Sequence, residues 1–274
     1  MKNYLHRITV LASLALFLMS SPSWAADEFP GRAKYPGVPV LSKHELKAKF
    51  NDYVIVDTRS KLEFETLRIN GATNIPVASK TFADQIKTLR TKTHKTIVFY
   101  CNGRTCMKSY RAVKQANKAR VKNTIAYDAG MFEWAKAYPE MASLLGKSPI
   151  QPNEIISKKA FKARSLEPNA FMDKVHQLGS KSLVLDIRDK YQRGAAGFFP
   201  GKERWASLDD RKKLDEYIAQ AKRENRPLFI YDEVGKQVRW LQYALEKNNV
   251  KNYYFMETGA KGYYKQMMKD FGIR

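Results

Sequence analysis

Three short blocks of this sequence each occur twice, in the same order, and this repeat constrains the fold more than any other feature. The second copy of each block lies 129 to 131 residues after the first. Three matches in one order are hard to attribute to chance, so the chain is expected to contain one folding unit twice. The paired blocks are YVIVDTRS (53–60) with LVLDIRD (183–189), TIVFYC (96–101) with PLFIYD (227–232), and VKNTIAYDAG (121–130) with VKNYYFMETG (250–259).

Each repeated block has the composition of a buried parallel strand. It is a short apolar run, rich in β-branched and aromatic residues, that ends at a polar or glycine position. Helical patterns lie between the blocks, and the first opens with Ser42 and Glu45 at the spacing of a capping box. Alternating strands and helices predict an α/β fold with two domains, each a parallel sheet covered by helices on both faces. The expected helices are 42–50, 109–119, 208–225 and 238–248.

The two expected domains cover residues 27–145 and 155–274. The segment between them, 146–154, contains Pro149 and Pro152, which interrupt regular structure. Each domain is of ordinary size for a single hydrophobic core.

The first residues have the anatomy of a secretory signal peptide. Lys2 and Arg7 give a positive start, residues 8–19 form an apolar run, and small residues lead to a cleavage site after Ala25 or Ala26. This run is shorter than the roughly 20 residues needed to span a bilayer. We therefore expect residues 1–25 to be removed and the mature protein to be periplasmic, without stable membrane insertion after cleavage.

The formal net charge of +22 favours anionic partners such as small oxyanions or acidic proteins. Export argues against nucleic acid as a partner. Two cysteines are too few for a disulfide framework, and the four histidines lack a spacing that would indicate a metal site. No metal is therefore expected.

The only two cysteines, Cys101 and Cys106, occupy one short loop. Cys101 directly follows an expected strand, and the loop leads into a helix that is expected to begin near Ser109. At this edge of a parallel sheet, backbone N–H groups and the positive end of a helix favour an anion and stabilise a thiolate. Gly103 allows the loop to fold tightly. A thiol placed here is expected to be a nucleophile at neutral pH, and a structural disulfide between the two cysteines is the alternative. Further positive charge comes from Arg104, Lys108 and Arg111.

Several of these motifs together resemble the rhodanese domain. Their order covers nearly all of residues 40–140, and the second copy is similar over 180–265, so the chain resembles an exported tandem rhodanese-domain protein. The motifs are Asp-x-Arg at a strand end (57–59), GA-x-N-I-P (71–76), Tyr-Cys at the next strand end (100–101), and FEW after a glycine (132–134).

The resemblance implies a thiosulfate sulfurtransferase-like enzyme that uses no cofactor. In this family the loop cysteine takes the outer sulfur of thiosulfate or a similar anion, carries it as a persulfide, and passes it to cyanide or a thiol. Transposed to this chain, Cys101 is the catalytic nucleophile. The implied partners are a small sulfur-containing anion as donor, and a thiol or a periplasmic reductant as acceptor. The implied anion-binding loop is Asn102, Gly103, Arg104, Thr105, Met107 and Lys108, supported by Asp57, Arg59, Ser109 and Arg111.

The cysteine loop departs from the family pattern in its length. Gly103 is third in the loop instead of fourth, and Ser109 follows two residues late. The repeat offsets show the same surplus of two residues between Tyr100 and Val121. A pocket wider than usual is therefore expected.

The second copy departs in its chemistry, because Asp232 stands where the nucleophile would be. A carboxylate cannot take up a sulfane sulfur, so this domain is expected to be catalytically inactive. Its expected role is structural or in recognition, with Lys236 and Arg239 lining the site of the first domain.

Cys106 is an additional thiol within the loop, and its expected role is to resolve the chemistry of Cys101. It can condense with an oxidised Cys101, or displace sulfide from a persulfide, and so form a disulfide that a reductant reopens. Two other classes of function stay open: a protein that cycles between dithiol and disulfide, and a non-catalytic module that binds an anion or a partner. Phosphatases with a similar loop are disfavoured, because Cys106 or Met107 replaces their closing arginine.

Overall fold

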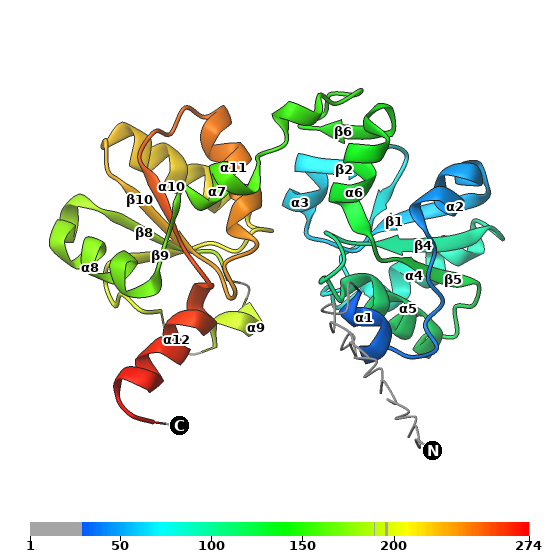
Figure 1. Cartoon of the computed structure of the whole chain (residues 1–274), viewed down its shortest axis with the longest axis horizontal. Coiled ribbons are helices and arrows are strands. Elements are labelled where there is room, and N and C mark those ends of the chain that lie inside the picture. Colours follow the sequence, from blue (N-terminus) through cyan, green and yellow to red (C-terminus); the bar gives the residue numbers. More distant parts are fainter. Residues whose placement is uncertain (1–28, 189, 195–196, 274) are drawn as a thin grey trace, which may run out of the picture.

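The computed structural model describes residues 29–188, 190–194 and 197–273, and it contains one parallel sheet in each half of the chain (Figure 1). The expected signal peptide, 1–25, lies outside the described residues. Within the described ranges, no helix has the length and apolar character that a membrane crossing requires.

The sheet of the first half has four parallel strands in the order β3-β1-β4-β5. A bridge from Val40 to Ala126 places a short fifth segment beside β5. A separate antiparallel pair, β2 with β6, completes this half. The strands are β1 (Tyr53–Asp57), β2 (Leu67–Ile69), β3 (Thr73–Asn74), β4 (Thr96–Tyr100), β5 (Thr124–Tyr127) and β6 (Ala142–Leu144).

Both faces of this sheet are buried, which explains why its strands are apolar without alternation. Val56 and Phe99 point to the face covered by α4 and α5. Ile55 and Val98 point to the opposite face, covered by α2 and α6. The helices of this half are α1 (Pro30–Lys34), α2 (Lys43–Ala48), α3 (Lys61–Thr66), α4 (Phe82–Thr91), α5 (Lys108–Lys118) and α6 (Gly130–Ala137).

The sheet of the second half has five parallel strands in the order β7-β11-β10-β8-β9. This is the order of the first sheet, with β7 at the place of the Val40 segment. One face packs against α10 and α11 and the other against α8 and α12. The elements are α7 (Lys158–Lys162), β7 (Ser165–Leu166), α8 (Pro168–Leu178), β8 (Leu183–Asp186), α9 (Lys190–Arg193), β9 (Glu203–Trp205), α10 (Arg211–Arg223), β10 (Leu228–Tyr231), α11 (Val238–Lys247), β11 (Tyr253–Met256) and α12 (Gly259–Asp270).

The predicted α/β class, with parallel sheets between helices, is confirmed. The four expected helices correspond to α2, α5, α10 and α11. The capping box of α2 also forms: Glu45 N donates to Ser42 Oγ at 3.2 Å, and Ser42 N donates to Glu45 Oε2 at 2.9 Å.

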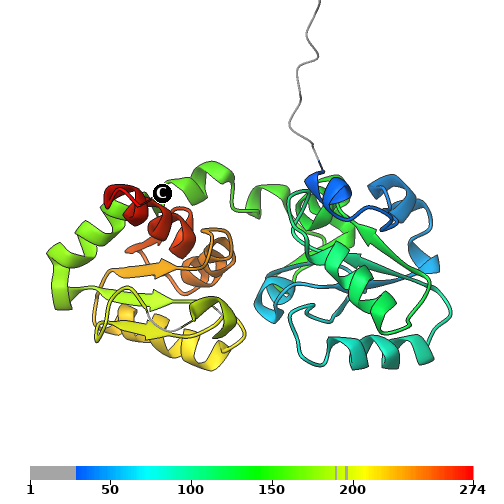
Figure 2. The ribbon, with the colours of Figure 1, turned by 90° about the horizontal axis from the view of Figure 1, so that it is seen from below.

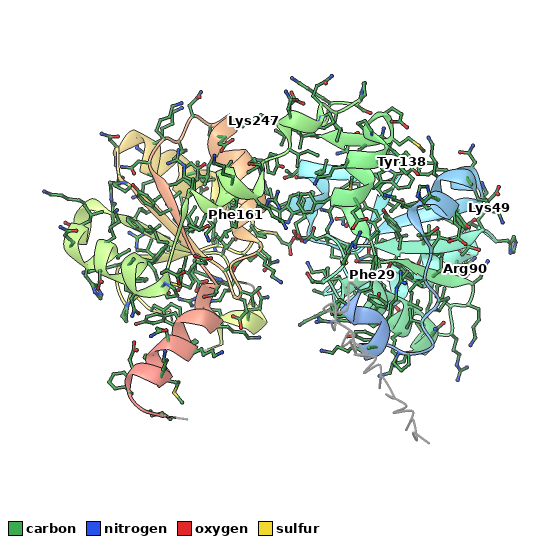
Figure 3. The ribbon with its side chains drawn as sticks, in the orientation of Figure 1. Phe29, Lys49, Arg90, Tyr138, Phe161 and Lys247 are labelled. Carbon is green, nitrogen blue, oxygen red and sulfur yellow. The ribbon has the colours of Figure 1, made fainter. Side chains whose placement is uncertain are left out.

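The two halves lie side by side and share apolar contacts (Figure 2). Leu62 of α3 is part of the core of the second half, while Trp240 and Tyr243 of α11 are part of the core of the first. Phe161 of α7 packs against both cores (Figure 3). These contacts bring side chains of α11 beside the elements that hold the cysteine loop.

Candidate active site

Cys101 lies at the carboxyl end of β4, between the ends of β1 and β5. The loop 101–107 has seven residues before α5, whereas the equivalent loop 232–237 of the second half has six. In addition, α5 has 11 residues and α11 has 10. The surplus of two residues seen in the sequence is thus divided between the loop and the helix.

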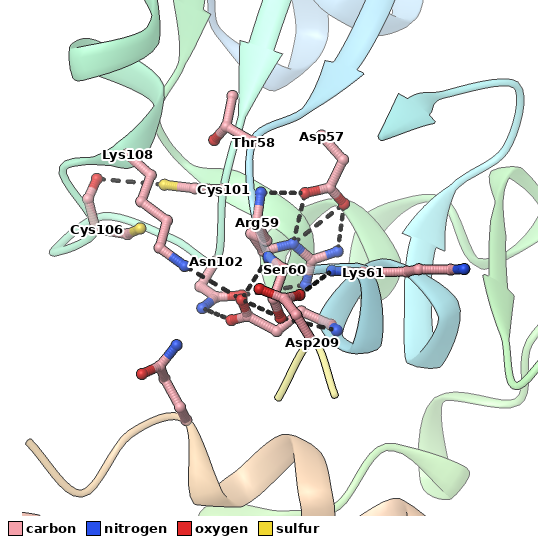
Figure 4. A network of polar contacts seen from close by, with 12 residues as sticks. Asp57, Thr58, Arg59, Ser60, Lys61, Cys101, Asn102, Cys106, Lys108 and Asp209 are labelled. Atoms are coloured by element: carbon pink, nitrogen blue, oxygen red, sulfur yellow. Dashed lines mark hydrogen bonds and ion pairs between the residues drawn. The ribbon is translucent and has the colours of Figure 1, made fainter. Parts of the chain in front are cut away.

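The longer loop covers the candidate nucleophile. The Cys101 thiol donates to the carbonyl oxygen of Cys106 at 3.3 Å (Figure 4). Its Sγ lies 3.7 Å from Ser109 Oγ. Cys101 has no exposed surface. The expected widening of the pocket is therefore not found at Cys101, because the added length folds the Cys106 carbonyl over the sulfur. Ser109, although late in the sequence, still reaches Cys101.

The two cysteines are both reduced, and they differ in acidity. Burial and the interaction with Cys106 raise the pKa of Cys101 well above its ordinary value. The interaction with Cys101 lowers the pKa of Cys106 to about 6, against the effect of burial, and the charge of Lys108 and the N–H groups of Lys108 and Asn102 act in the same direction. In this conformation burial therefore disfavours a thiolate at Cys101, where the sequence analysis expects one.

Asp57 and Arg59 form a buried ion pair beside the start of the loop. Arg59 Nε donates to Asp57 Oδ1 at 2.9 Å, and Arg59 Nη1 donates to Asn102 Oδ1 at 3.1 Å. Another donated hydrogen bond, from Arg59 Nη2, reaches the carbonyl oxygen of Leu67 at 2.5 Å. Because Asn102 directly follows Cys101, this guanidinium connects the end of β1 to the cysteine loop (Figure 4).

Glu63 is a member of the site that the sequence analysis missed. Its buried carboxylate accepts from Asn102 Nδ2 at 2.7 Å and from Lys108 Nζ at 3.2 Å. Burial alone would raise the pKa of Glu63, but the charges of Lys108 and Arg59 lower it to about 2. The available signal was Ser60-x-x-Glu63, a capping box directly after Asp-x-Arg, whose hydrogen bonds form in the structure.

The three cationic residues expected around the anion take different positions. Lys108 and Arg111 line a cavity next to the loop. Arg104 instead forms an ion pair with Glu133, and its guanidinium lies 4.8 Å from the centre of the Phe29 ring. The structure therefore does not place Arg104 beside a bound anion.

The remaining loop residues shape the backbone. Cys106 N donates to the carbonyl oxygen of Gly103 at 2.8 Å, which closes a tight turn. Thr105 is exposed, and Met107 precedes α5 and packs against the core beneath α4 and α5. Gly130 comes so close that a Cβ there would lie 2.4 Å from Gly103 N.

A cavity of about 420 Å³ lies between the two halves, beside the cysteine loop. Neither cysteine is among the residues that line it. The second half supplies part of the wall, although not through Lys236 or Arg239 as expected: the Arg239 guanidinium lies over the Phe132 ring. The lining residues include Thr58, Arg59, Ser60, Lys108 and Arg111 from the first half, and Ile187, Gln192, Ser207, Leu208, Asp209 and Gln237 from the second.

In the second half, Asp232 occupies the place of Cys101 at the end of β10. Its carboxylate accepts hydrogen bonds from four backbone N–H groups, including those of Val234 at 2.8 Å and Val238 at 3.0 Å. The other two donors are the N–H groups of Gly235 and Gln237. Burial nevertheless raises the pKa of Asp232. This loop therefore surrounds its own carboxylate and offers no nucleophilic sulfur.

No cluster of three or more His, Cys, Asp or Glu side chains suited to a metal ion occurs among the described residues. The chemistry available at this site is that of the two thiols, the cations Lys108 and Arg111, and the backbone N–H groups.

Residues 42–137, which contain the cysteine loop and its support, match the family described as the rhodanese-like domain. This part of the chain is a rhodanese-like domain. The match includes Asp57, Arg59, Cys101 and Cys106.

Several solved structures are similar to parts of the chain. Thiosulfate sulfurtransferase from Pseudomonas aeruginosa is 13% identical, with 86% of this chain and 43% of that chain covered and a TM-score of 0.36. The BH2092 protein from Bacillus halodurans is 18% identical, with 42% and 83% covered and a TM-score of 0.36. The As-Sb reductase from Leishmania major is 14% identical, with 39% and 86% covered and a TM-score of 0.35. No curated protein matches the sequence. Similarity at this level does not assign a function.

Proposed function

We propose that this protein is a thiosulfate sulfurtransferase-like enzyme in which Cys101 carries a sulfane sulfur as a persulfide. The placement of Cys101 is the main support. It follows the central strand of a rhodanese-like domain and begins a loop that ends at the N-terminus of α5. Backbone N–H groups and the positive end of a helix favour negative charge at such a place.

The first half-reaction is a displacement at sulfur. The Cys101 thiolate attacks the outer sulfur of thiosulfate, an S–S bond forms to Cys101, the S–S bond of thiosulfate breaks, and sulfite leaves with the electron pair. Burial raises the pKa of Cys101, so its proton must first go to a base. Opening of the loop relieves the burial that raises the pKa of Cys101, and the neighbouring Cys106 thiolate is then the base that takes this proton.

The second half-reaction passes the sulfur on. A thiol or cyanide attacks the outer sulfur of the persulfide and restores the Cys101 thiolate. In a second route Cys106 attacks the inner sulfur, the disulfide forms, and sulfide leaves with the Cys106 proton. A dithiol reductant then reopens the disulfide and becomes a disulfide itself.

Sulfur transfer requires the loop to open, because the Cys106 carbonyl covers Cys101 in this structure. The contact between the two cysteines also favours a second candidate function, a redox protein that cycles between dithiol and disulfide. Both functions use the same pair of thiols, and they differ in whether a sulfur atom is gained.

The wider organisation belongs to the same proposal. Residues 27–145 form the active domain, and 155–274 form a second rhodanese-like domain that is inactive because Asp232 replaces the thiol. The shared strand order of the two sheets supports this. Residues 1–25 direct the chain to the periplasm, where a small sulfur-containing anion is the donor and a thiol or dithiol is the acceptor.

Intact mass spectrometry tests the proposal directly. The fully reduced protein is incubated with thiosulfate and then with cyanide or a thiol. We expect a gain of one sulfur atom, mapped to Cys101, and its loss with the acceptor. The Cys101→Ser variant is the matched control and should gain nothing.

The alternatives give different masses in the same experiment. A loss of two hydrogens in the parent would indicate the redox cycle only if Cys106→Ser, which cannot form the disulfide, also gains no sulfur; a sulfur gain in Cys106→Ser would assign the loss to the second route of sulfur transfer. An unchanged mass in the parent protein would contradict sulfur transfer, and an unchanged mass after an added small-molecule disulfide oxidant as well would contradict the redox cycle and leave a non-catalytic binding module.

A further inference from the structure

Trp240 of α11 crosses from the second half into the core of the first. It is 1% exposed. Its ring stacks on Phe132 with 5.1 Å between ring centres and 19° between planes. The Arg59 guanidinium lies over the same residue, 5.0 Å from the ring centre. One aromatic side chain of the second half thus contacts two residues of the first.

Both of these neighbours are hydrogen-bonded to Asn102. Arg59 Nη1 donates to the side-chain oxygen of Asn102 at 3.1 Å. Phe132 N donates to the main-chain carbonyl oxygen of Asn102 at 3.5 Å. Asn102 directly follows Cys101, and its N–H group helps to stabilise the Cys106 thiolate. Trp240 therefore lies behind two of the contacts that fix the first residue after the candidate nucleophile, and the third is the hydrogen bond from Asn102 to Glu63.

The start of α11 is held in turn by Asp232. Val238, the first residue of α11, and Gln237, its N-cap, both donate their backbone N–H groups to the Asp232 carboxylate. Trp240 is two residues further along the helix. The residue that replaces the nucleophile in the second half is thus part of the support for the helix that carries Trp240.

We propose that Trp240 is a positioning residue for the cysteine loop, and that the second half holds the active-site loop of the first half through it. The expected change in the rate of sulfur transfer rests on the proposed function. The expected change in the accessibility and acidity of the loop thiols does not. Arg59 is wholly buried, so water cannot replace the contact that its guanidinium would lose.

The test compares Trp240→Leu with Trp240→Phe in the full chain. Leucine stays apolar but removes the ring from Arg59 and Phe132, whereas phenylalanine keeps an aromatic face. Phe171→Leu is the matched control, because Phe171 is a buried aromatic residue of the second half that packs against Phe199 and Phe229 instead. Circular dichroism and thermal unfolding establish that each variant is folded.

Three readouts should change in Trp240→Leu, the first two of them in opposite directions. Alkylation of the buried Cys101 by iodoacetamide, mapped by peptide mass, should be faster by about tenfold, because the loop opens more often. Sulfur transfer should lose about tenfold or more in kcat with a smaller change in KM, because a small misplacement of reacting groups is costly. The pH midpoint for alkylation of Cys106 should also rise towards the ordinary range of a thiol. Trp240→Phe should restore most of all three readouts, and Phe171→Leu should leave them unchanged.

The outcomes separate this inference from the proposed function. A folded Trp240→Leu protein with the parent's alkylation rate and pH midpoint would refute the positioning role, whatever its sulfur transfer. If the parent takes no sulfur from thiosulfate, the proposed function fails and alkylation still decides the role of Trp240. If Trp240→Leu does not fold, Phe132→Leu removes the same ring contact from the other side, and unchanged alkylation there would equally refute the proposal.

Discussion

The loops 101–107 and 232–237 follow equivalent strands in the two halves, and each directs backbone N–H groups at an anionic side chain of its own. In the first loop this side chain is Cys106, whose pKa of about 6 reflects its contact with Cys101 and the N–H groups of Lys108 and Asn102. In the second loop it is Asp232, which accepts from four N–H groups. The two loops therefore direct backbone N–H groups at anions in different positions: a thiolate five residues after Cys101 in the first half, and a carboxylate at the strand end in the second.

The supports of the two loops are also related. Arg59 pairs with Asp57 and reaches Asn102, while Arg188 pairs with Asp186 and lies 4.0 Å from Glu233. A difference lies one turn further on, where Glu63 of the first half corresponds to Gln192 of the second at the offset of 129. The Asp–Arg ion pair beside the loop is thus present in both halves, although an aspartate stands at the place of Cys101 in the second. The ion pair therefore supports the loop whether or not the loop holds a thiol.

The largest expected effect comes from exchanging the residue at the strand end. Cys101→Ser should reduce sulfur transfer by at least about 10³-fold, because no other group can accept the sulfur at this place. Asp232→Ala should keep persulfide formation within about tenfold, since the second loop has no thiol and the change can reach Cys101 only through the support of α11 and Trp240. Intact mass and steady-state sulfite release measure both. If Asp232→Ala abolishes sulfur transfer in a folded protein, the second loop takes part in the reaction and its assignment as catalytically inactive is wrong.

The next effect concerns Glu63, whose counterpart in the second half is Gln192. The pKa of Glu63 is lowered to about 2, so Glu63 stabilises the fold at neutral pH. This contribution is present above about pH 4.5 and is lost as the pH falls towards 2, and the shift corresponds to about 3 kcal/mol at neutral pH. Glu63→Gln should remove most of it and flatten the acid dependence. Urea unfolding at pH 7 and pH 3 measures the difference; parallel curves for parent and variant would contradict the assignment.

A smaller loss of stability is expected when the second loop loses its carboxylate. Asp232→Ala leaves four N–H groups without their acceptor, which should cost about 2 kcal/mol of the free energy of unfolding. Cys106→Ala, the counterpart in the first loop, should cost less, because fewer N–H groups act on its thiolate. Urea unfolding measures both variants. If they lose the same free energy of unfolding, the two anionic side chains stabilise their loops equally, and this prediction is wrong.

The smallest effect is a shift in the acidity of Cys106. Lys108→Gln removes one of several causes that lower the pKa of this thiol, so its alkylation midpoint should rise from about pH 6 by less than about one unit. Lys114→Gln, an exposed change further along α5, is the control and should leave the midpoint in place. Iodoacetamide labelling across pH 5 to 9 with peptide mapping gives the midpoints. If the alkylation midpoint of Cys106 in the parent protein already lies in the ordinary range of a thiol, the first loop does not stabilise a thiolate at Cys106.

Local sequence patterns were sufficient to predict much of this protein. The repeated apolar blocks predicted the central strands of both halves, because a strand buried on both faces must be apolar along its length. Ser42 and Glu45 predicted the start of α2 through contacts only three residues apart. The position of Cys101 at a strand end, ahead of a helix, also followed from the order of residues alone.

The remaining features depend on which residues meet across long sequence separations, and only the tertiary structure decides that. Arg104 turns to Glu133, 29 residues away, instead of towards the cavity. Glu63 joins the site because α3 places its carboxylate beside Asn102 and Lys108. The ring of Trp240 lies behind Arg59 because α11 of the second half packs against the first. A residue's type and spacing determine what it can bind, but its neighbours are set by how the helices pack on the sheets, which local patterns do not encode.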